Sequence, residues 1–332
     1  MSFRKRIFNL IGDEAFDLVC LDIFRYQYRE NEIYRNFVDS IGVDPANITQ
    51  TVQIPFLPVS FFRTHKVITG QSHPEKIFVS SGTSTSSVTE ARARHHVTDL
   101  SIYDESLVRS FEIFHRPLNS YIIFALTPTP EQNPDSSLIY MISKWISASG
   151  SELSDFYLNR MELMAERLEQ CYRSHSRILI IGLSYALLDF AEQFPMDISR
   201  VLMMETGGMK GKRPEMVKEE LHRYLAQHFH FEPGDIHSEY GMTELLSQAY
   251  SKGEGKFRTP PWMKVLIRDV NDPLTLLNNG SSGGINIIDL ANFNSCSFLA
   301  IQDLGKLNVD GTFEVLGRFD NSDLRGCNLL MD

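Results

Sequence analysis

The sequence RILIIGLSYALLDFAEQ, residues 177–193, joins a nearly unbroken apolar run to a segment with apolar residues at helical spacing. The run from Arg177 to Ile181 is typical of a buried strand, and Ser184 to Gln193 of a helix. A second strand is predicted over 201–205, and a further helix over 215–229, opening after Pro214. Strands that alternate with helices of about 10 to 15 residues favour a mainly parallel sheet covered by helices, an α/β fold.

The same alternation extends toward the N-terminus, and the pattern changes near residue 253. Periodicity predicts the helices 13–29, 32–41, 100–114, 138–149 and 159–172 and the strands 76–80 and 121–126. Beyond 253 the pattern indicates short strands with turns, at 263–268, 284–289, 298–303 and 312–316. We therefore expect an α/β core with N-terminal helices over 1–252 and a β-rich, barrel-like subdomain over 253–332.

Composition and charge exclude several classes of function. The 332 residues carry 32 Lys and Arg against 42 Asp and Glu, a net charge of −10, which repels nucleic acid and anionic membranes. The longest apolar window, 178–188, is shorter than the roughly 18 residues that span a bilayer. The four cysteines have no CxxC spacing, and the apolar run near the N-terminus is too short for an export signal. The sequence predicts a cytoplasmic protein without a membrane span.

A hydroxyl-rich loop follows the strand predicted at 76–80. Phe78-Val79-Ser80-Ser81-Gly82-Thr83-Ser84-Thr85-Ser86-Ser87 contains seven hydroxyl groups and one glycine. Hydroxyls and backbone N–H groups in such a loop can surround a polyphosphate. No Gly-Lys-Ser/Thr follows, so the loop is not a Walker A motif. By itself it is either a flexible surface loop, which we favour, or a phosphate cradle.

A second polar segment, Ser238-Glu239-Tyr240-Gly241-Met242-Thr243-Glu244, follows a strand predicted at 235–237. We expect a tight turn at Gly241 and a helix that opens at Thr243, where Glu244 would hold Mg²⁺. An ordinary capped helix start explains the same residues. Glu239 is either a second acidic group near Mg²⁺ or a solvated side chain, and we favour the solvated side chain.

Two later segments, Ile301-Gln302-Asp303-Leu304-Gly305 and Gly317-Arg318-Phe319-Asp320, are strand-end turns when taken alone. In order, the four segments resemble the motifs of the adenylate-forming superfamily, which includes acyl- and aryl-CoA synthetases and acyl-protein synthetases. The resemblance implies the N-terminal domain of such an enzyme. Because the chain ends twelve residues after Asp320, it also implies that the mobile C-terminal domain with its catalytic lysine is absent.

The resemblance implies a role in ATP binding for each matching residue. The phosphates would contact Ser80, Ser81, Gly82, Thr83 and Ser84, and the adenine would lie beside Gly207 and Gly208 and stack on Tyr240 of the Tyr240-Gly241 turn. Thr243 would contact the α-phosphate, Glu244 would hold Mg²⁺, Asp303 would bind the ribose, and Arg318 would approach the ribose or a phosphate. One departure is that Ser86-Ser87-Val88-Thr89 replaces the superfamily's Gly-x-Pro-Lys.

A narrower likeness rests on Ser80-Ser81-Gly82-Thr83, His96-Val97-x-Asp99-Leu100 and Ser136-Ser137-Leu138-Ile139-Tyr140-Met141. These stretches are similar to the acyl-protein synthetase of bacterial fatty-acid reductase systems. That family implies activation of a fatty acid by ATP, a C-terminal acceptor cysteine matched here by Cys327, and a partner such as an acyl reductase or acyl-carrier protein. The alternatives are an acyl- or aryl-CoA ligase, a non-catalytic binding relic and, for Cys327, a small apolar tail residue.

Overall fold

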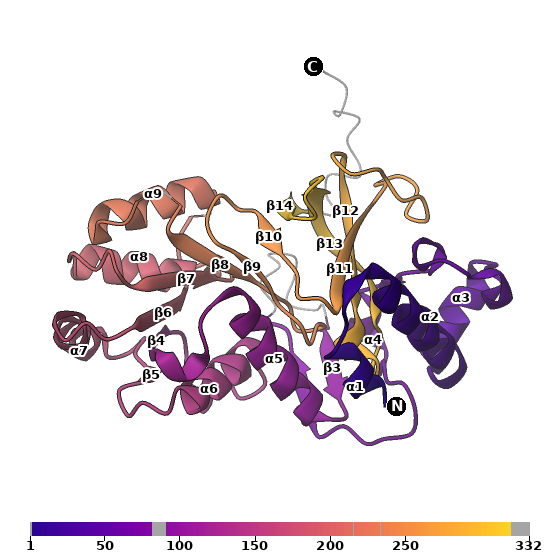
Figure 1. Cartoon of the computed structure of the whole chain (residues 1–332), viewed down its shortest axis with the longest axis horizontal. Helices are drawn as coiled ribbons and strands as arrows, with labels where there is room; N and C mark the ends of the chain where they lie inside the picture. The colour runs from indigo at the N-terminus through magenta and orange to yellow at the C-terminus, as the bar shows by residue number, and fades with distance from the viewer. Residues whose placement is uncertain (1, 82–90, 215, 233, 320–332) are drawn as a thin grey trace, which may run out of the picture.

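The computed structural model describes residues 2–81, 91–214, 216–232 and 234–319. A mixed sheet of 12 strands runs through it in the order β11-β12-β13-β14-β10-β9-β8-β7-β6-β4-β5, with β1 beside β13. Helices cover both faces of the sheet (Figure 1). The strands are β1 (Leu57–Pro58), β4 (Ile122–Leu126), β5 (Asp155–Phe156), β6 (Ile178–Leu183), β7 (Leu202–Thr206), β8 (Ile236–Tyr240), β9 (Ala249–Ser251), β10 (Phe257–Arg258), β11 (Met263–Arg268), β12 (Ser282–Asp289), β13 (Phe298–Leu307) and β14 (Phe313–Arg318).

One half of the sheet is parallel and buried on both faces. Strands β5, β4, β6, β7 and β8 pair in parallel, and alternate residues enter two separate apolar cores. Leu179 and Ile181 pack on the side of α5 (Leu100–Phe114) and α6 (Ser137–Ser149), whereas Ile178 and Ile180 face α7 (Met161–Arg173), α8 (Ser184–Gln193) and α9 (Lys218–Phe229). A two-sided core explains why these strands read as continuous apolar runs.

The other half is antiparallel, from β8 through β9, β10, β14, β13 and β12 to β11. Two N-terminal helices, α2 (Gly12–Glu30) and α3 (Glu32–Ser40), pack beside its far end (Figure 1). Buried Gln27 donates to the carbonyl of Phe293 at 3.0 Å, and buried Asn31 to that of Ser295 at 2.8 Å. These bonds join segments more than 260 residues apart in the sequence.

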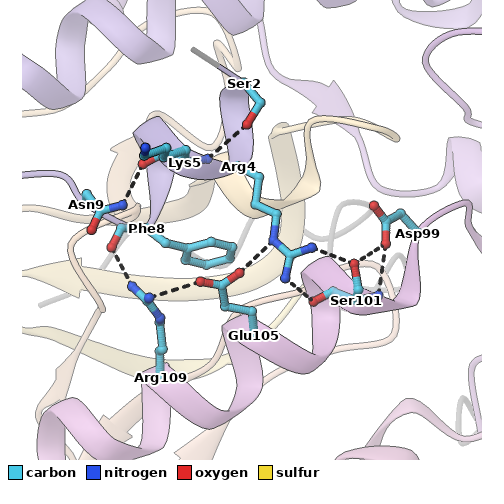
Figure 2. Close-up of polar contacts among 9 residues, drawn as sticks. All are labelled: Ser2, Arg4, Lys5, Phe8, Asn9, Asp99, Ser101, Glu105 and Arg109. Atoms are coloured by element: carbon cyan, nitrogen blue, oxygen red, sulfur yellow. Dashed lines mark hydrogen bonds and ion pairs between the residues drawn. The ribbon is translucent and has the colours of Figure 1, made fainter.

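A short N-terminal helix, α1 (Phe3–Ile7), is held to α5 by a polar network (Figure 2). Arg4 Nε lies 2.7 Å from Glu105 Oε2, and Arg109 Nη2 lies 3.1 Å from the other oxygen of the same carboxylate. Arg109 also donates to the carbonyl of Phe8 at 2.6 Å. The Glu105 carboxylate therefore connects the N-terminal residues of the chain to α5.

A separate hairpin of β2 (Lys76–Val79) and β3 (Arg94–Val97) carries the hydroxyl-rich loop between its strands. The short helix α4 (Phe61–Thr64) precedes it. The hairpin joins the parallel half of the fold because the Val79 N–H donates to the carbonyl of Asp135 at 2.8 Å. This bond places the end of β2 beside the residues that lie just before α6.

The α/β fold with a mixed, helix-covered sheet is confirmed, and most predicted elements agree within two or three residues. One helix boundary is wrong: α9 begins at Lys218, not directly after Pro214, because Val217 has an extended backbone and serves as its N-cap. Within the residues that the structure describes, no helix has both the length and the apolar character to span a bilayer. The division at residue 252 stays a prediction, since β9 and β10 pair across it in one sheet.

Candidate active site

A cleft of about 380 Å³ lies at the carboxyl ends of the parallel strands. This is the edge at which α/β sheets commonly bind ligands, and the volume is typical of small-molecule sites. Leu183 and Thr206 end β6 and β7, and Gly241 directly follows β8. The other lining residues belong to β2, α5, α6, α8 and β8 and to the segments that follow β2, β4, β7 and β8. They are Val79, Ser81, Tyr103, Pro128, Asn133, Ser136, Ser137, Leu138, Ile139, Met141, Tyr185, Gly207, Lys210, Lys212, Glu239, Met242, Thr243 and Gln248.

Four of the residues predicted for nucleotide binding line this one cleft: Ser81, Gly207, Gly241 and Thr243. They come from three different segments of the chain, around residues 81, 207 and 241–243. Gly207 has a φ of +65°, a conformation that favours glycine, and allows the sharp turn after β7. A Cβ on Gly241 would lie 2.6 Å from Glu239 Oε1, so a larger residue there would displace the Glu239 carboxyl group. Both glycines therefore expose backbone to the cleft.

A second group of predicted residues forms a cluster next to the cleft. The Tyr240 hydroxyl donates to Asp303 Oδ2 at 2.6 Å, and Arg318 Nε lies 3.8 Å from Asp303 Oδ1. Asp303 and Arg318 face each other across β13 and β14. Burial raises the pKa of Asp303, while Tyr240 and Arg318 act in the opposite direction. The ring of Tyr240 packs against Phe257 and Phe313.

The helix predicted at Thr243 is wrong. Residues 241–248 form turns between β8 and β9. Buried Asp289 accepts the backbone N–H groups of Leu246 at 2.8 Å and Ser247 at 3.0 Å, the donors that a helix would use internally. The interpretation of Thr243 as a helix N-cap therefore fails, although Thr243 does line the cleft.

Buried side chains fix the backbone of Thr243 and Glu244. His95 Nδ1 donates to the Thr243 carbonyl at 2.8 Å, and Asn292 Nδ2 donates to the Glu244 carbonyl at 2.8 Å. Burial lowers the pKa of His95 to about 4. His95 belongs to β3, the strand after the hydroxyl-rich loop, and thus connects that hairpin to the segment 241–248. Nothing in the sequence pattern singled out His95 or Asn292.

The remaining predicted residues have different positions. Ser80 closes the β2–β3 hairpin, because its hydroxyl accepts the Ala93 N–H at 3.1 Å. Gly208 is exposed beside Gly207, and half-buried His96 lies outside the residues that line the cleft. Gly82, Thr83, Ser84 and Cys327 lie outside the described residues.

Glu244 is the residue predicted to hold Mg²⁺. Its side chain is buried, and burial raises its pKa to about 7, against the influence of Arg318 and Arg63. No group of three His, Cys, Asp or Glu suited to a metal occurs within the described ranges. Mg²⁺ bound with a nucleotide needs only one or two carboxylates, because phosphate and water oxygens complete its shell. A single carboxylate beside Thr243 fits that donor set.

Sequence reasoning missed a pair of acidic groups at the ends of β7 and β8. Glu239 is buried, so its interpretation as a solvated side chain is wrong. It accepts a hydrogen bond from Thr206 Oγ1, its neighbour across the two strands. Glu205 is also buried and pairs with Lys218. Burial raises the pKa of Glu239 to about 7, and the charge of Glu205 acts in the same direction.

The environment of Glu205 lowers its pKa, whereas that of Glu239 raises it. Burial alone would raise the pKa of Glu205, but Lys218 and hydrogen bonds from His222, Lys218 and Ser238 outweigh burial and lower it to about 2. Two neighbouring carboxyl groups with separated pKa values are a common feature of catalytic and binding sites. In the sequence, the position of Glu239 directly before Tyr240 was the one indication that these two carboxyl groups lie near the site.

Lys210 was also missed. Its Nζ lies 3.3 Å from Ser81 Oγ, so it joins the turn after β7 to the start of the hydroxyl-rich loop. Lys210 and Lys212 both line the cleft. Two ammonium groups beside hydroxyl and backbone donors favour an anionic ligand at this side of the cleft.

The arrangement of sheet and cleft is that of the N-terminal domain of adenylate-forming enzymes. The family of acyl-protein synthetases named LuxE matches residues 12–332, and the chain belongs to this family. No curated protein matches the sequence.

Solved structures share the fold at low sequence identity. ATP-bound MatB from Rhodopseudomonas palustris is 13% identical, with a TM-score of 0.54 over 73% of this chain and 47% of that one. McyG A-PCP complexed with phenylalanyl-adenylate is 15% identical, with a TM-score of 0.52 over 73% of this chain and 40% of that one. A luciferase-like enzyme from the mealworm Zophobas morio is 15% identical, with a TM-score of 0.50 over 76% of this chain and 60% of that one. The chain thus spans about half the length of such structures.

The raised pKa of Glu239 predicts a pH-dependent stability difference. From pH 4.5 to about 7 the native chain keeps a proton that the unfolded chain, with its carboxyl pKa near 4.5, has lost. This group therefore lowers the free energy of unfolding as pH rises through that window. We expect Glu239→Gln, which stays neutral, to become progressively more stable relative to wild type from pH 4.5 to 7, and no further above.

Urea unfolding at a series of pH values measures this difference. Glu166→Gln, the same change at an exposed position on α7, is the control and should show no such trend. A difference for Glu239→Gln that stays constant between pH 4.5 and 7 would contradict the assignment of a raised pKa.

Proposed function

We propose that this protein activates a carboxylic acid, of the fatty-acid class, with ATP as an acyl-adenylate and then transfers the acyl group to a protein thiol. The observation that carries the proposal is the cleft shared by Ser81, Gly207, Gly241 and Thr243, next to the Tyr240, Asp303 and Arg318 cluster. Membership of the acyl-protein synthetase family supports it. MatB is described as ATP-bound and McyG as complexed with an adenylate, which agrees with a nucleotide in this cleft.

In the first step, a carboxylate oxygen of the acid attacks the α-phosphorus of ATP. A new phosphorus–oxygen bond forms, the bond to the β-phosphate bridging oxygen breaks, and pyrophosphate leaves. The nucleophile is already ionised at pH 7, so the protein needs no general base. Its contribution is to position the two anions and to stabilise the charge on the phosphates.

Each residue at the cleft has a proposed part in that step. The Ser81 hydroxyl and Lys210 ammonium donate to phosphate oxygens, and Thr243 contacts the α-phosphate. Adenine lies between Tyr240 and the backbone at Gly207 and Gly208. A Mg²⁺ ion bound with ATP would supply Lewis-acid polarisation of the phosphates, with Glu244 as its protein ligand.

Asp303 and Arg318 are proposed to bind the ribose. Asp303 already accepts from the Tyr240 hydroxyl, which leaves carboxylate lone pairs for a ribose hydroxyl. Arg318 is about half-exposed and is placed to approach the ribose or a phosphate. The side chains that hold the segment 241–248, His95, Asp289 and Asn292, act as positioning residues.

In the second step, a thiolate attacks the acyl carbonyl, a thioester forms and AMP leaves. Cys327 is the proposed acceptor within the chain, two residues from Arg325, whose charge would favour the thiolate. The thiol proton passes to solvent. A partner such as an acyl reductase or acyl-carrier protein would then take the acyl group, in the cytoplasm.

Glu244→Gln tests the first step. The amide keeps the size of the side chain but binds Mg²⁺ weakly, so we expect acid-dependent ATP–pyrophosphate exchange to fall at least about a hundredfold. Exchange of radioactive pyrophosphate into ATP measures it, and exposed Glu166→Gln should retain the wild-type rate. An unchanged exchange rate in Glu244→Gln would remove Glu244 from the metal role.

Cys327→Ala tests the second step. Wild-type protein incubated with ATP, Mg²⁺ and radioactive fatty acid should become labelled, whereas Cys327→Ala should not, although its ATP–pyrophosphate exchange continues. Cys171→Ala removes a buried cysteine of α7 and should leave labelling intact. Labelling that persists in Cys327→Ala would place the acceptor elsewhere, and thioester formation that requires coenzyme A would favour an acyl-CoA ligase.

A further inference from the structure

Two buried polar side chains face the cleft without a full set of partners. Glu239 is 7% exposed and Gln248 is 3% exposed, and both line the cleft. The two side chains lie close together, because a Cβ on Gly241 would lie 2.6 Å from Glu239 Oε1 and 3.4 Å from Gln248 Cγ. The turn at Gly241 thus brings a carboxylate and an amide to the same wall.

The hydrogen-bond capacity of this wall is largely unused. One Glu239 oxygen accepts from Thr206, and no bond to the other occurs among the described residues. Gln248 Oε1 is buried and has no hydrogen-bond partner there. Buried acceptors are nearly always paired in proteins, because a buried acceptor without a partner destabilises the native state. A ligand that donates hydrogen bonds would satisfy both groups.

The surroundings of Glu239 and Gln248 favour a ligand that donates hydrogen bonds over a phosphate. A phosphate has no donor for two acceptors, and an ionised Glu239 repels it. Lys210 and Ser81, which do suit an anion, are joined to each other within the same cleft. The side chains of Tyr103, Ile139 and Met141 give the cleft an apolar wall that suits a carbon chain. This combination fits a mostly apolar chain that carries a polar substituent.

We propose that the acid activated at this site carries a hydrogen-bond donor on its chain, a hydroxyl or an amino group, which Glu239 and Gln248 receive. The inference rests on the proposed function and narrows its substrate class. A hydroxyl can donate to one acceptor and accept from a protonated Glu239, and an ammonium can donate to both side chains. An unsubstituted fatty acid leaves both acceptors buried against methylene groups.

The consequence is selection against unsubstituted chains. A site built to hydrogen-bond a substituent discriminates strongly against the analogue that lacks it, since the buried polar groups of the site then have no partner. We expect at least about a tenfold advantage in kcat/KM for the substituted acid over the unsubstituted acid of equal length.

ATP–pyrophosphate exchange with the full-length chain tests this preference. The probes are straight-chain acids of six and ten carbons, each unsubstituted or carrying a hydroxyl or amino group at the third or the terminal carbon. The inference expects at least one substituted acid to exceed its unsubstituted partner about tenfold. If the unsubstituted acids are the best substrates at both lengths, the inference is overturned while the proposed function stands. If no acid supports exchange, the proposed function fails and this inference fails with it.

Two variants test whether Glu239 and Gln248 cause the preference for substituted acids. Glu239→Leu and Gln248→Leu remove the acceptors and should reduce or reverse the ratio of kcat/KM for the substituted acid over that for the unsubstituted acid. Calorimetric binding of the same acids to each variant gives a readout that does not depend on turnover. Glu166→Leu, at an exposed site, should keep the wild-type preference.

Glu239→Gln separates the two substituents. It retains an acceptor for a hydroxyl but removes the charge that pairs with an ammonium. A loss of preference confined to the amino-substituted acids therefore identifies an amino group as the substituent. A preference that survives unchanged in both Glu239→Leu and Gln248→Leu would overturn the assignment of the donor to these two residues.

Discussion

The site depends on how the backbone of residues 241–248 is held. Asp289 accepts the N–H groups of Leu246 and Ser247, and His95 and Asn292 donate to the carbonyls of Thr243 and Glu244. All three side chains are buried, so their bonds face little competition from water. They come from β3, β12 and the short helical turn after β12, and therefore fix the cleft relative to the β2–β3 hairpin and to the antiparallel half of the sheet.

The register between β7 and β8 is the second constraint. It sets Thr206 opposite Glu239 and Glu205 opposite Ser238, so two carboxyl groups lie at one edge of the sheet in different environments. Glu205 is ionised by its contact with Lys218, whereas Glu239 faces the cleft with a raised pKa. Among the described residues that line the cleft, Glu239 is thus the one acidic side chain, and Lys210 and Lys212 line the same cleft.

The sequence was sufficient for the architecture because hydrophobic periodicity carries it: the runs at 178–183 and 122–126 are buried on both faces, as predicted. The resemblance to the adenylate-forming superfamily pointed to Ser81, Gly207, Gly241 and Thr243, which share the cleft. Local pattern failed at Thr243, where long-range bonds from Asp289 replace helical ones. It missed His95 and Gln248 and took Glu239 for a solvated side chain, because their roles come from burial and from neighbours distant in sequence, which periodicity does not encode.

The central claim is that these distant segments surround one ATP molecule, and photolabelling tests it directly. Irradiation with 8-azido-ATP followed by peptide mapping should place the label in residues 203–210 or 236–248, and excess ATP should suppress it. Labelling confined to other surfaces, such as α2 and α3, or labelling that ATP does not suppress, would contradict the account.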